Sequence, residues 1–358
     1  MKKLLLLLIC LLLMAGTAQA AEVPQDLVRA LPEDAAPLLR GQDLSGSGAF
    51  SDGVSALLDS LRGRMGAVLR QRIRGAVSVL LVVILCGAVD GLGKAAGEQE
   101  SMFLSMAGAL SITLLTAGSL DTLLGLGRET IEQLSLFSRA LLPTLAAATA
   151  AAGSIGTATV QQVTAVFLVD LLVTMIHQLL LPLVYLYIGV LTASAALPDG
   201  RLGALAEGLK KTITWMLTTS LLLFTIYLSV SRVFTGAADA AAIKVTKAAI
   251  SGVVPVVGGI ISDAAETVLA GAGLLKNTIG VFGTLAILAA CAYPFLQLGI
   301  QYLLYKLTAF LAAALGAPRL CRLVDGLGGA FGLVLGMTGS CALLILISVL
   351  SSVAAVVP

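Results

Sequence analysis

Long apolar segments separated by short polar ones dominate the chain from residue 76 to the C-terminus. A helix of roughly 20 apolar residues is long enough to cross a bilayer. The clearest runs cover residues 76–92, 103–126, 213–230 and 331–357, with one carboxylate, Asp90, inside the first. The pattern therefore predicts an all-α, polytopic integral membrane protein with a multi-span domain that extends from residue 76 to residue 358.

The remaining segments allow two interpretations each, so the predicted number of transmembrane helices is six to eight. Residues 128–139 carry four charges and predict a short amphipathic connector, and residues 140–152 form a weak span rich in Ala and Thr. Residues 163–197 are too long for one untilted span and contain Pro182, which predicts either a kinked helix or a tight hairpin. Residues 278–314 hold one or two spans around another proline.

The first 20 residues have the pattern of a secretory signal peptide. Lys2 and Lys3 precede an apolar stretch over residues 4–14, and a small-x-small pattern ends at Ala20. This arrangement predicts cleavage between Ala20 and Ala21, because the apolar stretch is too short to span a membrane. An uncleaved membrane anchor is the alternative.

Two further segments separate the signal from the membrane domain. Residues 21–53 contain three prolines and an alternating Ser-Gly stretch, which predict a flexible extracytoplasmic leader. Residues 54–75 place apolar side chains at three- and four-residue steps with five arginines mostly between them. This predicts a basic amphipathic helix that lies on the membrane surface, or an ordinary surface helix over the membrane domain. Export of the leader would leave these arginines outside, against the positive-inside rule.

The amino-acid composition supports a membrane protein and excludes several kinds of site. Hydrophobic residues make up 58% of the chain and charged residues only 12%, about half the share typical of soluble domains. The net charge of +2 and the lack of a basic, aromatic-rich patch predict no nucleic-acid partner. With one His, no phosphate-binding loop and widely spaced cysteines, we expect no enzyme activity, no metal and no cofactor.

Ionisable residues inside apolar spans are the first candidates for function, because burying a charge in hydrocarbon costs at least a few kcal/mol. Asp90 lies near a predicted helix end, and Lys306 lies inside an apolar run. Asp170 and His177 are two helical turns apart and therefore share a face. This pair predicts either a hydrogen-bonded contact with another span or a proton relay.

The segment from residue 250 to residue 275 combines apolar character with residues that break a helix. Backbone groups left unpaired at membrane depth are tolerated only inside protein or beside a water-filled cavity. Broken helices of this kind occur at transporter binding sites, but they also occur in purely structural re-entrant loops. The candidate conduit or re-entrant segment comprises Ser251, Gly252, Pro255, Gly258, Gly259, Ser262, Asp263, Glu266 and Lys276.

The stretch from residue 239 to residue 315 resembles the stage III sporulation protein AE family. The residues that carry this resemblance are 244–250, the break at 251–259, Ser262-Asp263, 266–269, 274–277 and 304–306. The resemblance implies an endospore-forming bacterium and a place in the mother-cell membrane around the forespore. It also implies the other stage III sporulation A operon proteins, including an ATPase and ring-forming proteins, as partners, together with membrane lipid.

These observations favour a non-enzymatic membrane subunit of a sporulation channel complex that supports late forespore gene expression. One alternative is a stand-alone secondary transporter with Asp263, Glu266 and Lys276 in its site. The other is a membrane scaffold that only anchors ring proteins.

Overall fold

The computed structural model describes residues 23–32, 35–39, 49–95, 102–152, 155–197, 201–253, 258–314 and 318–353. These residues form helices and the turns beside them, which confirms the predicted all-α class. In chain order the elements are α2 (Gln25–Arg29), α3 (Ala36–Leu39), α4 (Ala49–Ala95), α5 (Met102–Ala151), α6 (Ile155–Met175), the π-helical turn η1 (Ile176–Leu180), α7 (Leu181–Ala196), α8 (Arg201–Val253), α9 (Gly258–Ala313) and α10 (Pro318–Val353).

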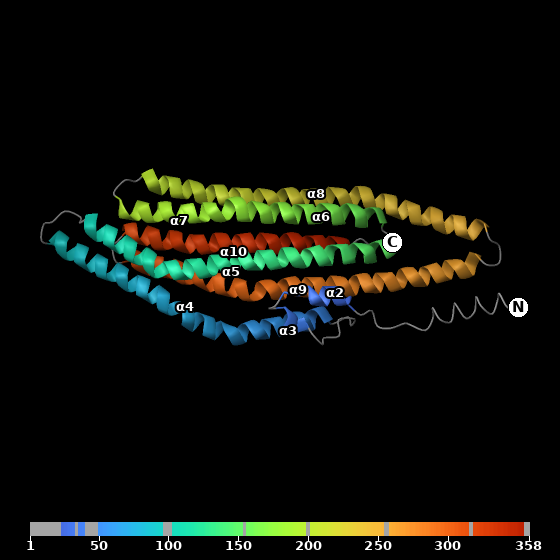
Figure 1. Ribbon diagram of the computed structural model, residues 1–358, viewed down its shortest axis with the longest axis horizontal. Coiled ribbons are helices and arrows are strands. Elements are labelled where there is room, and N and C mark those ends of the chain that lie inside the picture. Colours follow the sequence, from blue (N-terminus) through green and yellow to red (C-terminus); the bar gives the residue numbers. More distant parts are fainter. Residues whose placement is uncertain are drawn as a thin grey trace.

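The long helices lie side by side along one axis (Figure 1). Helices α6 and α7 form one rod through η1, and each rod runs antiparallel to the next in the chain. Helix α10 contacts each of the other long helices and is the central element of the bundle. Helices α4, α7 and α9 end, and helices α5, α8 and α10 begin, at the same end of the bundle (Figure 1).

The rods are much longer than a bilayer is thick. Helix α5 has 50 residues and α9 has 56, which correspond to about 75 and 84 Å at 1.5 Å per residue. The hydrocarbon core of a bilayer is only about 30 Å thick. Each rod therefore contains a membrane-length segment and a comparable length of helix beyond it.

Several elements that the apolar pattern separates are continuous in the structure. Helix α4 runs without a break through the predicted boundary at residues 75–76. Helix α5 joins residues 103–126, the predicted connector at 128–139 and the weak span after it, with Pro143 inside the helix. Charged residues interrupt an apolar run but do not interrupt backbone hydrogen bonding, so these segments merge.

Five stretches of the described residues are long and apolar enough to cross a membrane, fewer than the six to eight predicted from the sequence. The predicted span at 213–230 is not among them and extends past residue 227, beyond which the side chains of α8 are not described. The five stretches are Ala49–Leu92, Phe103–Ala151, Gln162–Ala196, Leu275–Ala313 and Pro318–Val353.

Residues 163–196 lie in one rod with a widened turn, so the segment is a single helical element and the hairpin alternative is wrong. Pro182 is the second residue after η1 and has no backbone N–H, so the carbonyl of Gln178 has no donor at the position where an α-helix would supply one. A wider turn takes up the proline ring without ending the helix. Residues 275–314 likewise form a single helix that continues through Pro294.

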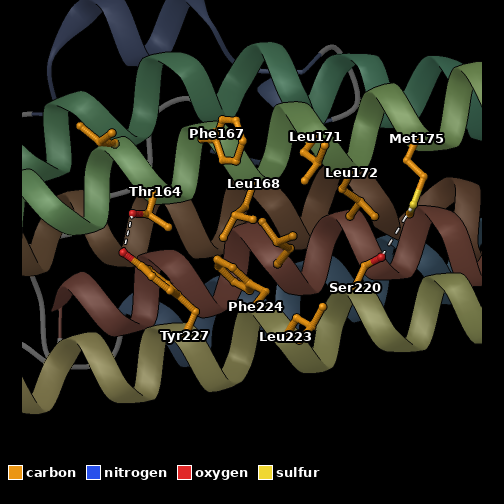
Figure 2. Close-up of a pocket in the computed structure, with 12 residues that line it drawn as sticks. Thr164, Phe167, Leu168, Leu171, Leu172, Met175, Ser220, Leu223, Phe224 and Tyr227 are labelled. Carbon is orange, nitrogen blue, oxygen red and sulfur yellow. Dashed lines mark hydrogen bonds between the residues drawn. The ribbon is translucent and has the colours of Figure 1, made fainter.

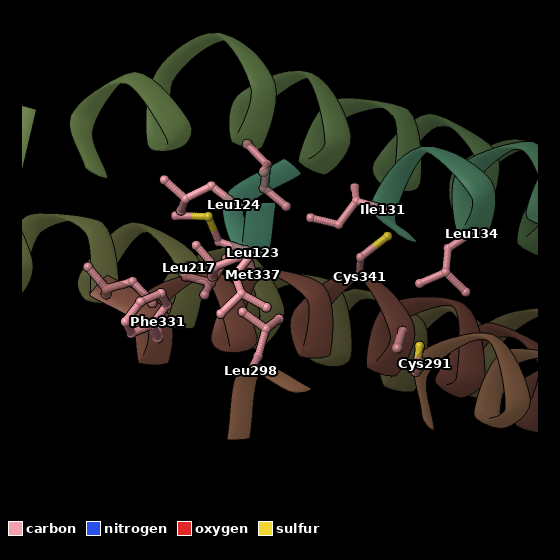
Figure 3. Packing of buried hydrophobic residues seen from close by; sticks show 14 of the residues in the cluster. Leu123, Leu124, Ile131, Leu134, Leu217, Cys291, Leu298, Phe331, Met337 and Cys341 are labelled. Carbon is pink, nitrogen blue, oxygen red and sulfur yellow. The ribbon is translucent and has the colours of Figure 1, made fainter. Parts of the chain in front are cut away.

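The core lies where α5, α9 and α10 meet, with α8 closing one side. Figure 3 shows the buried side chains of this cluster, including Leu123, Phe331 and Met337, in close contact. Glycines allow the helices to approach closely here. A Cβ at Gly127 of α5 would lie 2.3 Å from Cγ1 of Val334 on α10. The bundle is therefore held by close packing rather than by large side chains alone.

The described part of the predicted leader forms two short helices, α2 and α3, which contact the bundle. Its last residues, 49–53, already belong to α4, so this long helix begins before the predicted boundary at residue 54. Leu27 of α2 and Leu39 of α3 are buried, and α3 contacts both α4 and α9. The predicted cleavage site at Ala20 and Ala21 lies outside the described residues, so that prediction stays open.

Candidate functional site

Ion pairs cross from α5 to the α6–α7 rod near the middle of the bundle. Arg139 of α5 donates to Oδ1 of Asp170 on α6, at 2.9 Å from Nη2 and 3.3 Å from Nε. Both side chains are about half exposed. Asp170, which the apolar pattern marks as a candidate, thus makes an interhelical contact.

His177, the other member of the predicted pair, lies in the π-turn η1. Its Nδ1 is 3.5 Å from Oε1 of Glu132 on α5, and the same carboxylate oxygen accepts a 3.1 Å hydrogen bond from Nε of Arg128. Asp170 and His177 therefore face the same neighbouring helix but bind different partners there. This arrangement supports the interhelical contact and not a direct relay between the two residues.

These pairs form a charged belt, which we define as Arg128, Glu132, Arg139, Asp170 and His177. On α5 the belt separates two stretches without charge, residues 103–120 and 140–151. Paired charges are tolerated beside apolar surface far better than single ones. The belt therefore separates two apolar stretches of α5 where this helix faces the α6–α7 rod.

A second charged contact joins α9 to α10. Nζ of Lys306 lies 2.5 Å from Oδ1 of Asp325, and the Lys306 side chain also lies over the ring of Tyr302 at 5.9 Å from its centroid. Lys306 is another residue that the apolar pattern marks, and its partner Asp325 is 19 residues later in the chain. The pair links the two helices just before the turn that joins them.

Buried hydroxyl groups add uncharged contacts near this pair. Oγ1 of Thr116 on α5 and the hydroxyl of Tyr305 on α9 are 3.0 Å apart, and both residues are buried. The hydroxyl of Tyr187 on α7 donates to the carbonyl oxygen of Gly326 on α10 at 3.0 Å. Gln301 is also buried, and its Oε1 has no hydrogen-bond partner among the described residues.

The candidate conduit segment lies at the opposite end of the bundle from the turns that precede α8 and α10. Ser251 and Gly252 belong to the last turn of α8, and Gly258 and Gly259 begin α9. Pro255 lies outside the described residues. Ser262, Asp263, Glu266 and Lys276 all lie on α9, and Lys276 is buried. The break is thus the turn between two long helices, and its role in a conduit stays a prediction.

An apolar groove of about 690 Å³ lies between α6 and α8. Figure 2 shows Phe167 and Leu171 of α6 facing Phe224 of α8 across it. At one end of the groove the hydroxyl groups of Thr164 and Tyr227 are 3.0 Å apart. Its lining is apolar apart from the Met175 thioether and the hydroxyl groups of Thr164, Ser220 and Tyr227, and it includes no charged side chain.

Within the described residues, no group of three or more His, Cys, Asp or Glu side chains is placed to hold a metal ion. The four cysteines of the described chain are free thiols. The polar contacts found there connect helices to one another and do not converge on a single cavity. Such an arrangement can fix the packing of a bundle and the ends of a passage through it.

Sequence reasoning missed the partners in these contacts, above all Glu132, Arg139 and Asp325. Asp325 directly follows the apolar pair Leu323-Val324 and precedes a long apolar run, which is a usable signal. Glu132 and Arg139 lie in the segment 128–139, which the sequence predicts to be a short amphipathic connector between spans of the membrane domain. Only the continuity of α5 brings them opposite α6 and η1.

Comparisons with known proteins agree on one family. The family model described as Stage III sporulation protein AE matches residues 42–356. The Stage III sporulation protein AE of Bacillus subtilis (strain 168) is 24% identical over 251 residues, which are 69% of this chain and 62% of that protein. The match thus spans less than two thirds of the relative's length. No solved structure matches the chain.

Proposed function

Because the chain belongs to the stage III sporulation protein AE family, we propose that it is a non-enzymatic membrane subunit of the complex that links mother cell and forespore. In this role it supports late forespore gene expression. It crosses the mother-cell membrane around the forespore several times, and its partners are the other stage III sporulation A proteins. The single observation that carries the proposal is the family match, which covers nearly the whole chain.

The physical character of the bundle supports a subunit rather than an enzyme. The charged belt and the pair of Lys306 with Asp325 are used in contacts between helices. Helices α5 and α9 are about 2.5 and 2.8 times as long as a bilayer core is thick. A bundle of this length can contact proteins outside the membrane while it remains anchored within it.

The turn between α8 and α9 is the part of the chain that we assign to the conduit. Helix α8 ends at Val253 and α9 begins at Gly258, and the two helices run in opposite directions (Figure 1). Two glycines at the start of α9 permit close approach of another backbone. Asp263 is the sixth residue of α9, beyond the first turn where a carboxylate would complement the helix dipole, so in this proposal its charge serves an ion or substrate.

The test replaces Gly258 and Gly259 together with Leu in the spore-forming host, in a strain that lacks the native copy. The matched control places Leu at Gly189 and Gly299, two glycines at which a Cβ would meet no atom within 4 Å. We expect the first variant to accumulate in the membrane without supporting spore formation, while the control supports it. Normal sporulation with the first variant would exclude the conduit role.

Because α9 begins at Gly258, Asp263 does not lie at the start of a helix, and the predicted capping role is wrong. Asp263→Asn keeps the shape of the side chain and removes its charge. If an ion or substrate binds there, spore formation should fall, whereas normal spore formation would remove Asp263 from the proposed conduit. Co-purification of the operon partners with each variant reports whether a loss of sporulation reflects a failure of assembly.

A further inference from the structure

A small pocket with basic walls lies at the end of the bundle where α7 ends and α8 and α10 begin (Figure 1). Its volume is about 320 Å³, at the lower end of the range for small-molecule sites. Arg319 and Arg322 of α10 line it, together with Ser194 of α7 and Ala204 of α8. It is separate from the charged belt and from the apolar groove of Figure 2.

The charge around this pocket is positive. Its only carboxylate, Glu207 of α8, is 3.1 Å from Nζ of Lys211 and is therefore compensated by it. Arg319 also borders a smaller neighbouring pocket that includes Asp90. Nε of Arg322 donates to the carbonyl oxygen of Pro318 at 3.4 Å, which holds that side chain along the first turn of α10.

Two guanidinium groups with a nearby hydroxyl form a donor set that suits a phosphate group. Arginine presents its N–H groups in a planar fork that matches the oxygen atoms of a phosphate. Ser194 supplies a hydroxyl on the opposite wall. A carboxylate ligand would satisfy the same fork, but the setting of the pocket favours a phosphate.

Exposed apolar side chains lie beside the pocket. Leu197 and Leu205, on the two chain segments that border the pocket, are exposed at 42% and 52%, as expected for side chains that contact acyl chains. Basic pockets between transmembrane helices on the cytoplasmic side bind anionic lipid headgroups. The predicted export of the leader places this end of the bundle in the cytoplasm, because α4 would then run inward. The five arginines of residues 54–75 would then lie outside, so the positive-inside rule gives no separate support for this orientation.

We propose that the pocket binds the phosphate of an anionic phospholipid headgroup, such as phosphatidylglycerol, in the cytoplasmic leaflet. The volume admits a headgroup, and the acyl chains would lie against the exposed leucines. This inference stands apart from the proposed role in sporulation, because it concerns the residues at this end of the bundle and not the turn between α8 and α9.

The experiment measures the thermal stabilisation of the purified full-length chain as phosphatidylglycerol or phosphatidylcholine is added in detergent. We expect phosphatidylglycerol to stabilise the wild-type chain at lower concentration. In the double variant Arg319→Gln with Arg322→Gln, the concentration of phosphatidylglycerol needed for the same stabilisation should rise about 30-fold. This factor follows because each arginine near the membrane surface contributes about 1 kcal/mol to the binding of anionic lipid. The matched control is Arg29→Gln with Arg128→Gln, two exposed arginines of α2 and α5 that lie outside the pocket and give the same change in net charge.

If the stabilisation by phosphatidylglycerol weakens equally in the two double variants, the lipid is attracted by net charge alone, and the proposal is overturned. If Arg319→Gln with Arg322→Gln does not fold, Ala204→Glu, at an exposed position, adds a negative charge to the same pocket and should also weaken the response. An unchanged response in Ala204→Glu would then count against the site. Stabilisation by millimolar inorganic phosphate equal to that by the lipid would assign the pocket to a free anion instead.

Discussion

Replacing Gly127 with Ala should loosen the contact between α5 and α10. The new Cβ would lie 2.3 Å from Cγ1 of Val334, whereas nonbonded carbon atoms prefer about 3.5–4.0 Å, so the atoms must separate by about 1.2–1.7 Å. Val334 is fully buried, and its β-branched side chain has one strongly preferred rotamer in a helix. The clash must therefore move the helices, and overpacking of this kind costs about 1–3 kcal/mol.

Gly125→Ala is the matched control, because a Cβ there would meet no atom within 4 Å. Both substitutions gain the same helix propensity, about 1 kcal/mol relative to glycine, so this gain cancels in the comparison. Gly127→Ala should therefore be about 1–3 kcal/mol less stable than Gly125→Ala, and its Tm should be lower by several degrees. Thermal unfolding in detergent, followed by circular dichroism, measures the difference. Equal Tm values for the two variants would refute the close packing of α5 on α10.

Three further predictions follow from other contacts. The double-mutant cycle of Lys306→Gln and Asp325→Asn should give a coupling of about 0.5–1 kcal/mol in unfolding experiments, because the pair is partly exposed; a coupling of zero would remove it as a link between α9 and α10. Tyr305→Phe should lower the free energy of unfolding by about 0.5–1.5 kcal/mol. Adding Thr116→Val should lower it little further, since the Thr116 hydroxyl has already lost this partner; fully additive effects would show that the two hydroxyl groups do not interact. N-terminal sequencing of the mature membrane protein should begin at Ala21, and a sequence beginning at the initiator methionine would favour the uncleaved anchor.

The sequence predicts the class of this fold well and its element boundaries poorly, for a physical reason. Apolar runs mark where lipid or core must surround a helix, but a helix ends only where its backbone hydrogen bonds end. Residues 128–139 are polar yet helical, so a segment that composition separates is part of α5. Pro143 and Pro294 likewise lie inside continuous helices, because neighbouring helices support the turns around them.

For the candidate functional residues too, the sequence predicts one part of the answer and not the other. The apolar pattern correctly marks Asp170, His177 and Lys306 as charges that need partners, and each has one. The identities of the partners depend on which helices become neighbours and in what register. Arg139 and Asp170 are 31 residues apart in the chain, and no local spacing predicts that they meet.

The π-turn η1 has a consequence for how this chain can vary. A π-turn holds one more residue than an α-turn, so every residue after it is rotated by about 100° relative to an uninterrupted helix. Thr192, which follows the turn, contacts Thr113 of α5. Deleting one residue from 176–180 would remove the extra residue and the widened turn together, so Thr192 would keep its orientation towards α5. Deleting one residue from the regular part of α7 before Thr192 would instead rotate Thr192 by about 100° and turn it away from Thr113. The π-turn is thus the place where this rod can lose one residue, and a one-residue deletion within residues 183–190 should disturb the packing of α7 more than one within 176–180.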